Sequence, residues 1–87
     1  PYTDVFINIH FDLCEMERRS LEEQLASVGK DVSRMRFLHA QAVDNMRRTT
    51  ALYLKETQLG EDAQALRRWN DRVKEALSVD NWTMFGM

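Results

Sequence analysis

Apolar residues recur at alternating steps of four and three along the middle of the chain. This is the spacing of the a and d positions of a heptad repeat, sustained for more than four repeats. The series, which we call the seam, is Leu21, Leu25, Val28, Val32, Met35, His39, Ala42, Met46, Thr49 and Tyr53. It predicts helices that bury one stripe against other helices.

The seam passes Gly29 without a change of phase, and two structures fit this. Gly29 followed by Asp31 is typical of a helix end and a new N-cap, whereas a glycine inside one long helix costs about 1 kcal/mol. The unbroken phase favours continuity or a slight kink. One continuous element would be roughly 50 Å long, too long to pack on itself in so short a chain, and would need a partner helix.

A second apolar stripe follows Gly60. Glu61 and Asp62 after this glycine predict a helix end and the acidic first turn of another helix, which Ser78 or Asp80 ends. The stripe consists of Leu59, Leu66, Trp69, Val73, Ala76 and Leu77. We therefore expect one all-α domain with helices over about 4–28, 31–59 and 62–78 and an apolar tail over 79–87, in a coiled coil or helical bundle.

Residues 7–13 alternate between apolar and polar side chains, which is a strand signal. The alternative is the start of a helix with Thr3 or Asp4 as its N-cap. We favour the helix because no other segment reads as a strand, and a short N-terminal strand remains the alternative.

The two tryptophans of the chain close one fourteen-residue segment, residues 69–82. Thirteen steps of about 100° place Trp82 roughly 140° from Trp69 around a straight helix. Trp69 lies in the stripe with Leu66 and Val73, so we predict a core anchor in the last helix. Trp82 lies outside it, and we predict a separate contact, over the end of the bundle or on a partner.

Composition narrows the class of protein. The 87 residues carry twelve bases and fourteen acids, three glycines and one proline, which favours long helices without a global basic field. A single cysteine, Cys14, suits a reducing compartment, and we expect a cytoplasmic location. The apolar run at residues 5–7 is too short for a signal core or a membrane span. A first residue other than methionine is consistent with a segment of a longer protein.

Side chains with catalytic chemistry do not form a recognisable motif. We expect no catalytic, cofactor or metal site, since neither His10, His39 nor Cys14 has a Cys or His at ligand spacing. The arginine doublets at 18–19, 47–48 and 67–68 suggest phosphate contacts, yet acids precede most of them at helical ion-pair spacing. Binding to nucleic acid or an anionic membrane is therefore an alternative function, as is a small helical secretion chaperone.

Residues 69–82, WNDRVKEALSVDNW, contain an aromatic-Asn step, a Lys-Glu step and a Val-acid-Asn-Trp ending, and Tyr53-Leu-Lys55-Glu56-Thr57 precedes them. The matching positions are Trp69, Asn70, Val73, Lys74, Glu75, Val79, Asp80, Asn81 and Trp82, with Ser27-Val28-Gly29 and Met35 upstream. Over about two-thirds of the chain these motifs resemble a coiled-coil family, the first subunit of the biogenesis of lysosome-related organelles complex. Residues 1–20 lack a counterpart, and the family's tryptophan after its Lys-Gln-Thr step is absent here. The resemblance implies a non-enzymatic helical subunit of an elongated cytosolic complex that acts on endosomes and lysosomes.

The leading hypothesis is a non-enzymatic assembly subunit that binds other helical subunits in a homo- or hetero-oligomer, with nucleic acid not expected and membrane contact at most peripheral. The residues predicted to contact partners are Leu21, Leu25, Val28, Val32, Met35, His39, Met46, Tyr53, Leu66, Trp69, Val73, Leu77, Trp82 and Phe85.

Overall fold

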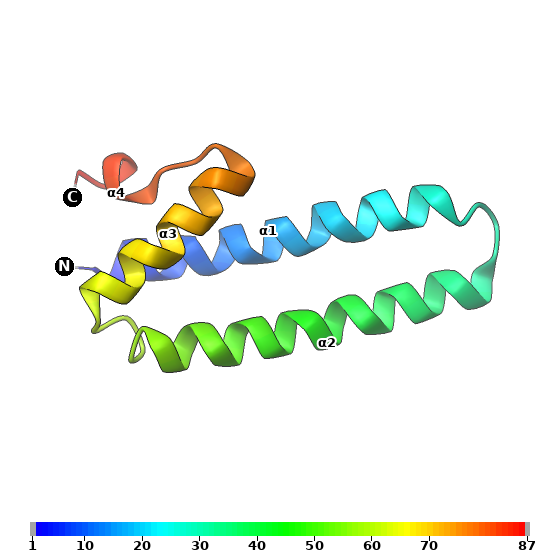
Figure 1. The fold of residues 1–87 in the computed structure, drawn as a ribbon, viewed down its shortest axis with the longest axis horizontal. Helices are drawn as coiled ribbons and strands as arrows, with labels where there is room; N and C mark the ends of the chain where they lie inside the picture. Colours follow the sequence, from blue (N-terminus) through cyan, green and yellow to red (C-terminus); the bar gives the residue numbers. More distant parts are fainter. Residues whose placement is uncertain (1, 87) are drawn as a thin grey trace.

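The computed structural model describes residues 2–86, and over this range its regular elements are all helices. The four helices are α1 (Thr3–Ser27), α2 (Val32–Glu56), α3 (Ala63–Leu77) and α4 (Asn81–Met84). Helices α1 and α2 form a long antiparallel hairpin, and α3 crosses α1 at the end that holds the chain termini (Figure 1). The molecule measures 46 × 24 × 16 Å. The predicted all-α class is confirmed.

Helix α1 includes residues 7–13, so the strand alternative is wrong for this segment. The buried residues Val5, Ile9 and Leu13 recur every four positions, which places them on one helical face. This stripe packs against α3 and α2. Residues 7–13 are therefore helical although their apolar and polar side chains also alternate.

Residues 28–31 reverse the chain, so α1 ends before Gly29 and α2 begins at a new N-cap, in place of the continuity or slight kink that the phase of the seam favoured. Gly29 has φ +63°, the left-handed conformation that glycine adopts without strain. The Asp31 side chain then accepts a hydrogen bond from the backbone N–H of Arg34 at 3.1 Å and caps α2. The seam is therefore divided between two antiparallel helices of one chain, so the chain supplies a partner helix itself.

Helix α2 ends at Glu56, three residues before the expected position. The Thr57 hydroxyl donates to the carbonyl of Tyr53 at 2.7 Å and is fully buried. A turn of three left-handed residues follows, namely Gln58, Leu59 and Gly60. A Cβ at Gly60 would lie 2.8 Å from Cγ of Phe6, so the close approach of α1 requires glycine here.

Helices α3 and α4 begin at aspartate caps. Asp62 accepts from the N–H of Ala65 at 3.0 Å, and Asp80 accepts from the N–H groups of Trp82 and Thr83. Ser78 follows the last residue of α3 and adopts the left-handed conformation.

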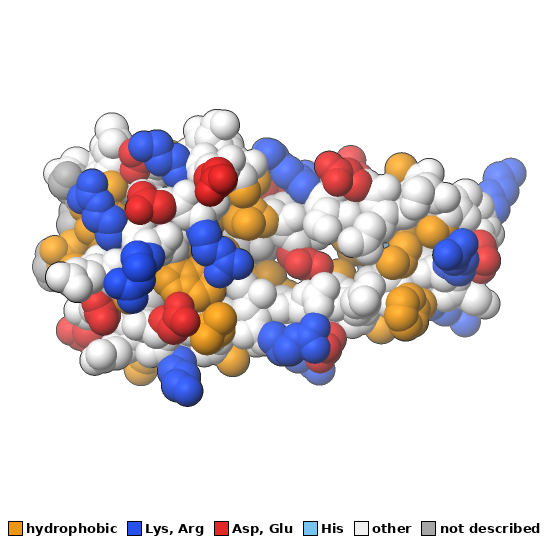
Figure 2. All heavy atoms as spheres, viewed as in Figure 1, with side chains coloured by type: hydrophobic (Ala, Val, Ile, Leu, Met, Phe, Trp, Pro, Cys, Tyr) orange, Lys and Arg blue, Asp and Glu red, His pale blue; other side chains and the backbone are white. Residues whose placement is uncertain are grey.

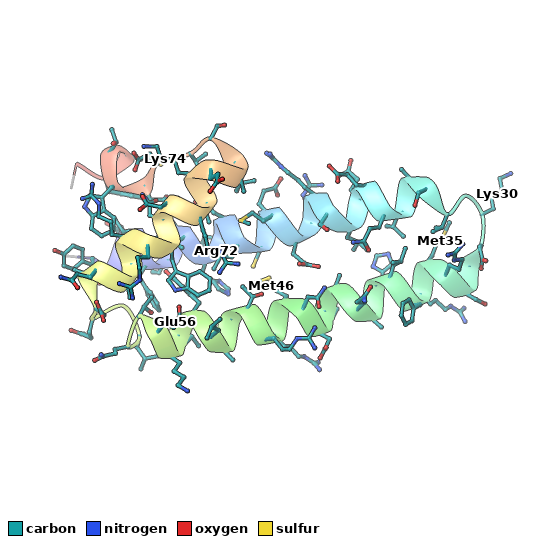
Figure 3. All side chains as sticks on the ribbon, in the orientation of Figure 1. Lys30, Met35, Met46, Glu56, Arg72 and Lys74 are labelled. Atoms are coloured by element: carbon teal, nitrogen blue, oxygen red, sulfur yellow. The ribbon has the colours of Figure 1, made fainter. Side chains whose placement is uncertain are left out.

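The buried core lies at one end of the hairpin, where three helices meet. Its members are Val5, Ile9 and Leu13 of α1, Tyr53 of α2, and Leu66, Trp69 and Val73 of α3. Toward the 28–31 turn only α1 and α2 are present, and seam side chains such as Leu21, Leu25 and Met35 are only partly buried. Met35 and Met46 lie between the two helices (Figure 3). We call the two-helix half, residues 18–42, the distal hairpin.

Candidate partner-binding surface

Aromatic and polar contacts fasten α3 to the hairpin. The Tyr53 hydroxyl donates to the carbonyl of Phe6 at 2.6 Å, and its ring meets Trp69 edge-on at 5.2 Å between centroids. Burial raises the pKa of the Tyr53 phenol well above its usual range. The indole N–H of Trp69 donates to Glu56 at 2.9 Å, and the Arg72 guanidinium lies 4.7 Å from its ring (Figure 3). These side chains serve the internal core.

A buried polar network joins α4 to α1 and α3. The Asn81 side chain donates to the Asp12 carboxylate at 2.7 Å and accepts from the Asn8 amide, while its backbone N–H donates to Asn70 Oδ1 at 3.0 Å. Asn70 in turn donates to Asp80 at 3.0 Å. Asn81 is completely buried and Asn70 nearly so. The network satisfies the polar groups that α4 brings into the interior.

Asp80 is held in its charged form by this arrangement. The hydrogen bond from Asn70, then the Thr83 backbone N–H, lower the pKa of the Asp80 carboxyl well below its usual range. The Lys74 ammonium lies 3.2 Å from the same carboxylate, between α3 and α4 (Figure 3). Asp80 therefore acts as a structural cap.

The segment that carries the family resemblance lies largely inside these contacts. Trp69, Asn70 and Val73 are buried in the three-helix end, and Asp80 and Asn81 belong to the polar network. Internal packing therefore gives each of these positions a structural role in this chain.

The residues predicted to bind partners fall into three groups. Tyr53, Leu66, Trp69 and Val73 are buried in the core of the chain. The partly buried members are Leu21, Leu25, Val28, Met35, Met46, Leu77 and Trp82, and the exposed members are Val32, His39 and Phe85. A partner can reach the second and third groups without unfolding the chain.

Trp82 makes the separate contact that its position in the sequence predicts. Its ring lies 5.8 Å from Tyr2, and the Arg67 guanidinium lies 5.3 Å from its centroid. Phe85, at the end of α4, is exposed. Trp82 thus covers the end of the three-helix core.

An apolar groove of about 600 Å³ runs between α1 and α2. Its lining includes His10 and Cys14 of α1 and Val43, Met46 and Leu54 of α2, and no residue of α3 or α4 lines it. His10 and Cys14 lie roughly a third of a turn or more around α1 from the centre of its buried stripe at Ile9, which packs on α3. The groove therefore opens on the side of the hairpin that α3 leaves uncovered.

The uncovered side continues along both helices, and we call it the open face. Steps of four and three from Ile7 reach Phe11, Cys14, Arg18, Leu21 and Leu25 on α1, and the matching positions of α2 are Val32, Arg36, Val43, Arg47 and Leu54. Phe11 is 63% exposed and Val43 51% exposed. Extending the seam backward from Leu21 by three and four residues would have found Ile7, Phe11 and Cys14 in the sequence.

The arginine doublets are engaged within the chain at several points. Arg18 pairs with Glu15 at 2.8 Å and Glu22 at 2.6 Å, and Arg19 pairs with Glu15 at 3.0 Å. The hydrogen bonds from Arg18 and then Arg19 lower the pKa of Glu15 to about 2. Acidic and basic side chains are interspersed over the face in Figure 2. This arrangement gives little support to a phosphate-binding stripe.

Within residues 2–86, His, Cys, Asp and Glu side chains nowhere gather in a group of three or more able to hold a metal ion. Over the same range, no helix combines the length and apolarity needed to cross a membrane. Comparison with known proteins found no matching family, no matching curated protein and no matching solved structure.

Proposed function

We propose that this chain is a non-enzymatic helical assembly subunit whose open face binds partner helices. The observation that carries the proposal is the large apolar surface along α1 and α2, where Phe11, Val32 and Val43 are each more than half exposed. Large apolar side chains exposed along two neighbouring helices commonly mark a surface that binds other proteins.

The shape of the surface favours helices as partners. The open face is a shallow groove between two antiparallel helices, and a third helix packs well into such a groove because its side-chain ridges fit between those of the pair. The distal hairpin adds a second argument, since most of its large apolar side chains, among them Leu21, Leu25 and Met35, are only partly buried by two helices. A partner would complete the bundle there.

Under this proposal, the residues expected to contact a partner differ from those predicted from the sequence. Leu21, Leu25, Val28 and Val32 stay in it, Ile7, Phe11, Val43 and Leu54 join it, and the four buried core residues leave it. A coiled-coil-like mode of packing follows from the spacing of these residues. The unpaired thiol of Cys14 suits a cytoplasmic location, and an endosomal or lysosomal complex rests on the sequence resemblance alone.

A photo-crosslinking amino acid at position 43 tests the proposal in cells that make the full chain. The matched control is the same amino acid at Phe37, which is 66% exposed on α2 but lies outside the open face. We expect crosslinks to a helical protein, either another protein or this chain itself, from position 43 and few from position 37. Equal crosslinking from both positions, or none from 43, would overturn the proposed function.

A further inference from the structure

We infer that the open face binds a second copy of this chain, so that two hairpins form a four-helix bundle around a two-fold axis parallel to the helices. The inference rests on the proposed function and names the partner. In this arrangement α1 of each copy lies antiparallel to α2 of the other, and α3 and α4 remain on the outside.

The size of the open face suits a dimer. A helix of 25 residues, as α1 and α2 both are, is about 37 Å long, and two side by side are about 20 Å wide. The face therefore offers on the order of 700 Å² per copy, close to the roughly 800 Å² per partner of specific protein interfaces. Burying it would remove Phe11, Val32 and Val43 from water.

The two edges of the open face carry opposite charge. At about 100° per residue, Asp4, Glu15 and Glu22 follow the outer edge on α1, while Arg36 and Arg47 follow the outer edge on α2. These two arginines form no ion pair with side chains of residues 2–86. Arg18 pairs with both Glu15 and Glu22 within the chain, so the α1 edge keeps an excess of acid and the α2 edge is basic, which is the pattern that a self-complementary surface needs.

The register of the hairpin brings these edges together in the dimer. Nε2 of His10 lies 3.2 Å from Oγ1 of Thr50, and Glu17 accepts a hydrogen bond from Asn45 at 3.4 Å. A residue of α1 and the residue of α2 at the same height along the hairpin therefore have numbers that sum to about 60. An axis parallel to the helices keeps every residue at its own level. It places Glu15 opposite Arg47 of the partner subunit, and Glu22 within a turn of Arg36 of the partner subunit.

The remaining charges on these edges agree with the same axis. Arg18, between Glu15 and Glu22 on α1, comes to the level of Asp44 of the partner subunit. An axis perpendicular to the helices would instead set α1 against α1 and α2 against α2. Acidic edges would then face acidic edges and basic edges basic ones, so the charges select the parallel axis.

The apolar part of the interface is tested with the purified full chain by sedimentation velocity and native mass spectrometry. We expect a concentration-dependent dimer, and Phe11→Ser should raise its dissociation constant at least about tenfold. Phe37→Ser, which removes an equally exposed ring outside the face, should leave the constant unchanged. Circular dichroism checks that both variants keep their helix content, and Val43→Ser serves as the second interface variant.

Charge exchange tests the axis. Glu22→Arg and Arg36→Glu should each weaken self-association, because each places like charges together twice across the two-fold axis. A mixture of the two variants should form a heterodimer in preference to either homodimer, since each basic edge then meets an acidic one. Glu23→Arg and Arg34→Glu, with the same exchanges on the opposite side of the hairpin, should show no such preference.

The outcomes separate the inference from the proposed function. A chain that remains monomeric up to about millimolar concentration, or a dimer indifferent to both Phe11→Ser and Val43→Ser, would overturn the second copy as partner. Crosslinks from position 43 to another protein would then leave the proposed function standing. A dimer sensitive to Phe11→Ser whose charge variants show no heterodimer preference would overturn the parallel axis.

Discussion

Asn81 joins three helices at a single buried position. Its side chain contacts Asn8 and Asp12 of α1, and its backbone N–H contacts Asn70 of α3. A polar group in the interior is stabilising only when its partners are present, because each lost hydrogen bond leaves a desolvated donor or acceptor. Asn81 therefore fixes where α4 lies.

Asn81→Ala should lower the free energy of unfolding by about 1–3 kcal/mol, because Asn8 and Asp12 each lose a hydrogen-bond partner. Urea denaturation followed by circular dichroism measures the change. Gln41→Ala on the exposed surface of α2 is the control and should change stability by less than about 0.5 kcal/mol. A variant as stable as the control would show that the network contributes nothing to the fold.

Asp80 gives the fold a dependence on acid. Its pKa is lowered in the folded chain, first by Asn70, so its stabilisation is present above the ordinary value of 3.8 and is lost as the pH falls below it. When the pH falls from about 5 to about 2.5, the free energy of unfolding should therefore decrease less for Asp80→Asn, which has no carboxyl group at this position, than for the wild type. Urea midpoints at the two pH values measure this, and equal losses in both proteins would contradict the role of Asp80.

Sequence reasoning found Trp69 and missed Asn81, for a physical reason. A tryptophan in an apolar stripe reports its own burial, because large apolar side chains leave water wherever they can. A short polar residue near a helix start usually marks a solvated cap. Asn81 is buried because Asn8 and Asp12, about seventy positions earlier, lie opposite it, and the local pattern does not contain that pairing.

For the helices and turns, too, the sequence predicts local features better than those that depend on distant residues. The end of α3 at Ser78 and the cap of α2 at Asp31 follow from local backbone chemistry and could be predicted. The reversal at Gly29 could not, because an unbroken heptad phase fits one long helix as well as two helices joined by a turn. Nor could the burial of Tyr53 by α3, which depends on a helix from the second stripe.

The third helix should depend on its two tryptophans unequally. Trp69 is 3% exposed and packs on Tyr53, so Trp69→Ala should cost about 3–5 kcal/mol of unfolding free energy. Trp82→Ala should cost less, about 1–2 kcal/mol, since Trp82 is only partly buried against the core, beside Tyr2 and Arg67. Thermal or urea melts measure both.

Assembly gives a second comparison of the tryptophans. Trp82 lies on the three-helix end, away from the groove of the open face, so Trp82→Ala should leave self-association unchanged where helix content is retained. From the sequence alone, a contact between Trp82 and a partner was one of the two alternatives. Equal losses of stability from both substitutions would contradict the placement of Trp82 at the rim of the core.

The whole molecule is uneven in stability. Seven core residues gather where α3 covers the hairpin, while the distal hairpin relies on two helices and partly buried side chains. Local opening costs least where few apolar contacts are broken, so the distal hairpin should open more readily in an isolated chain than the three-helix end does. A second copy on the open face would supply the missing contacts and raise the cost of opening there.

Amide hydrogen exchange of the purified chain across a range of concentrations tests this most directly. In dilute solution, we expect amides of residues 20–27 and 32–40 to exchange at least about tenfold faster than those of residues 5–13 and 66–73. As concentration rises through the dimer range, the distal amides should become protected, and Phe11→Ser should delay that protection to higher concentration. Distal protection that is already equal to that of the core in dilute solution, or that does not change with concentration, would contradict the assembly of this chain through its open face.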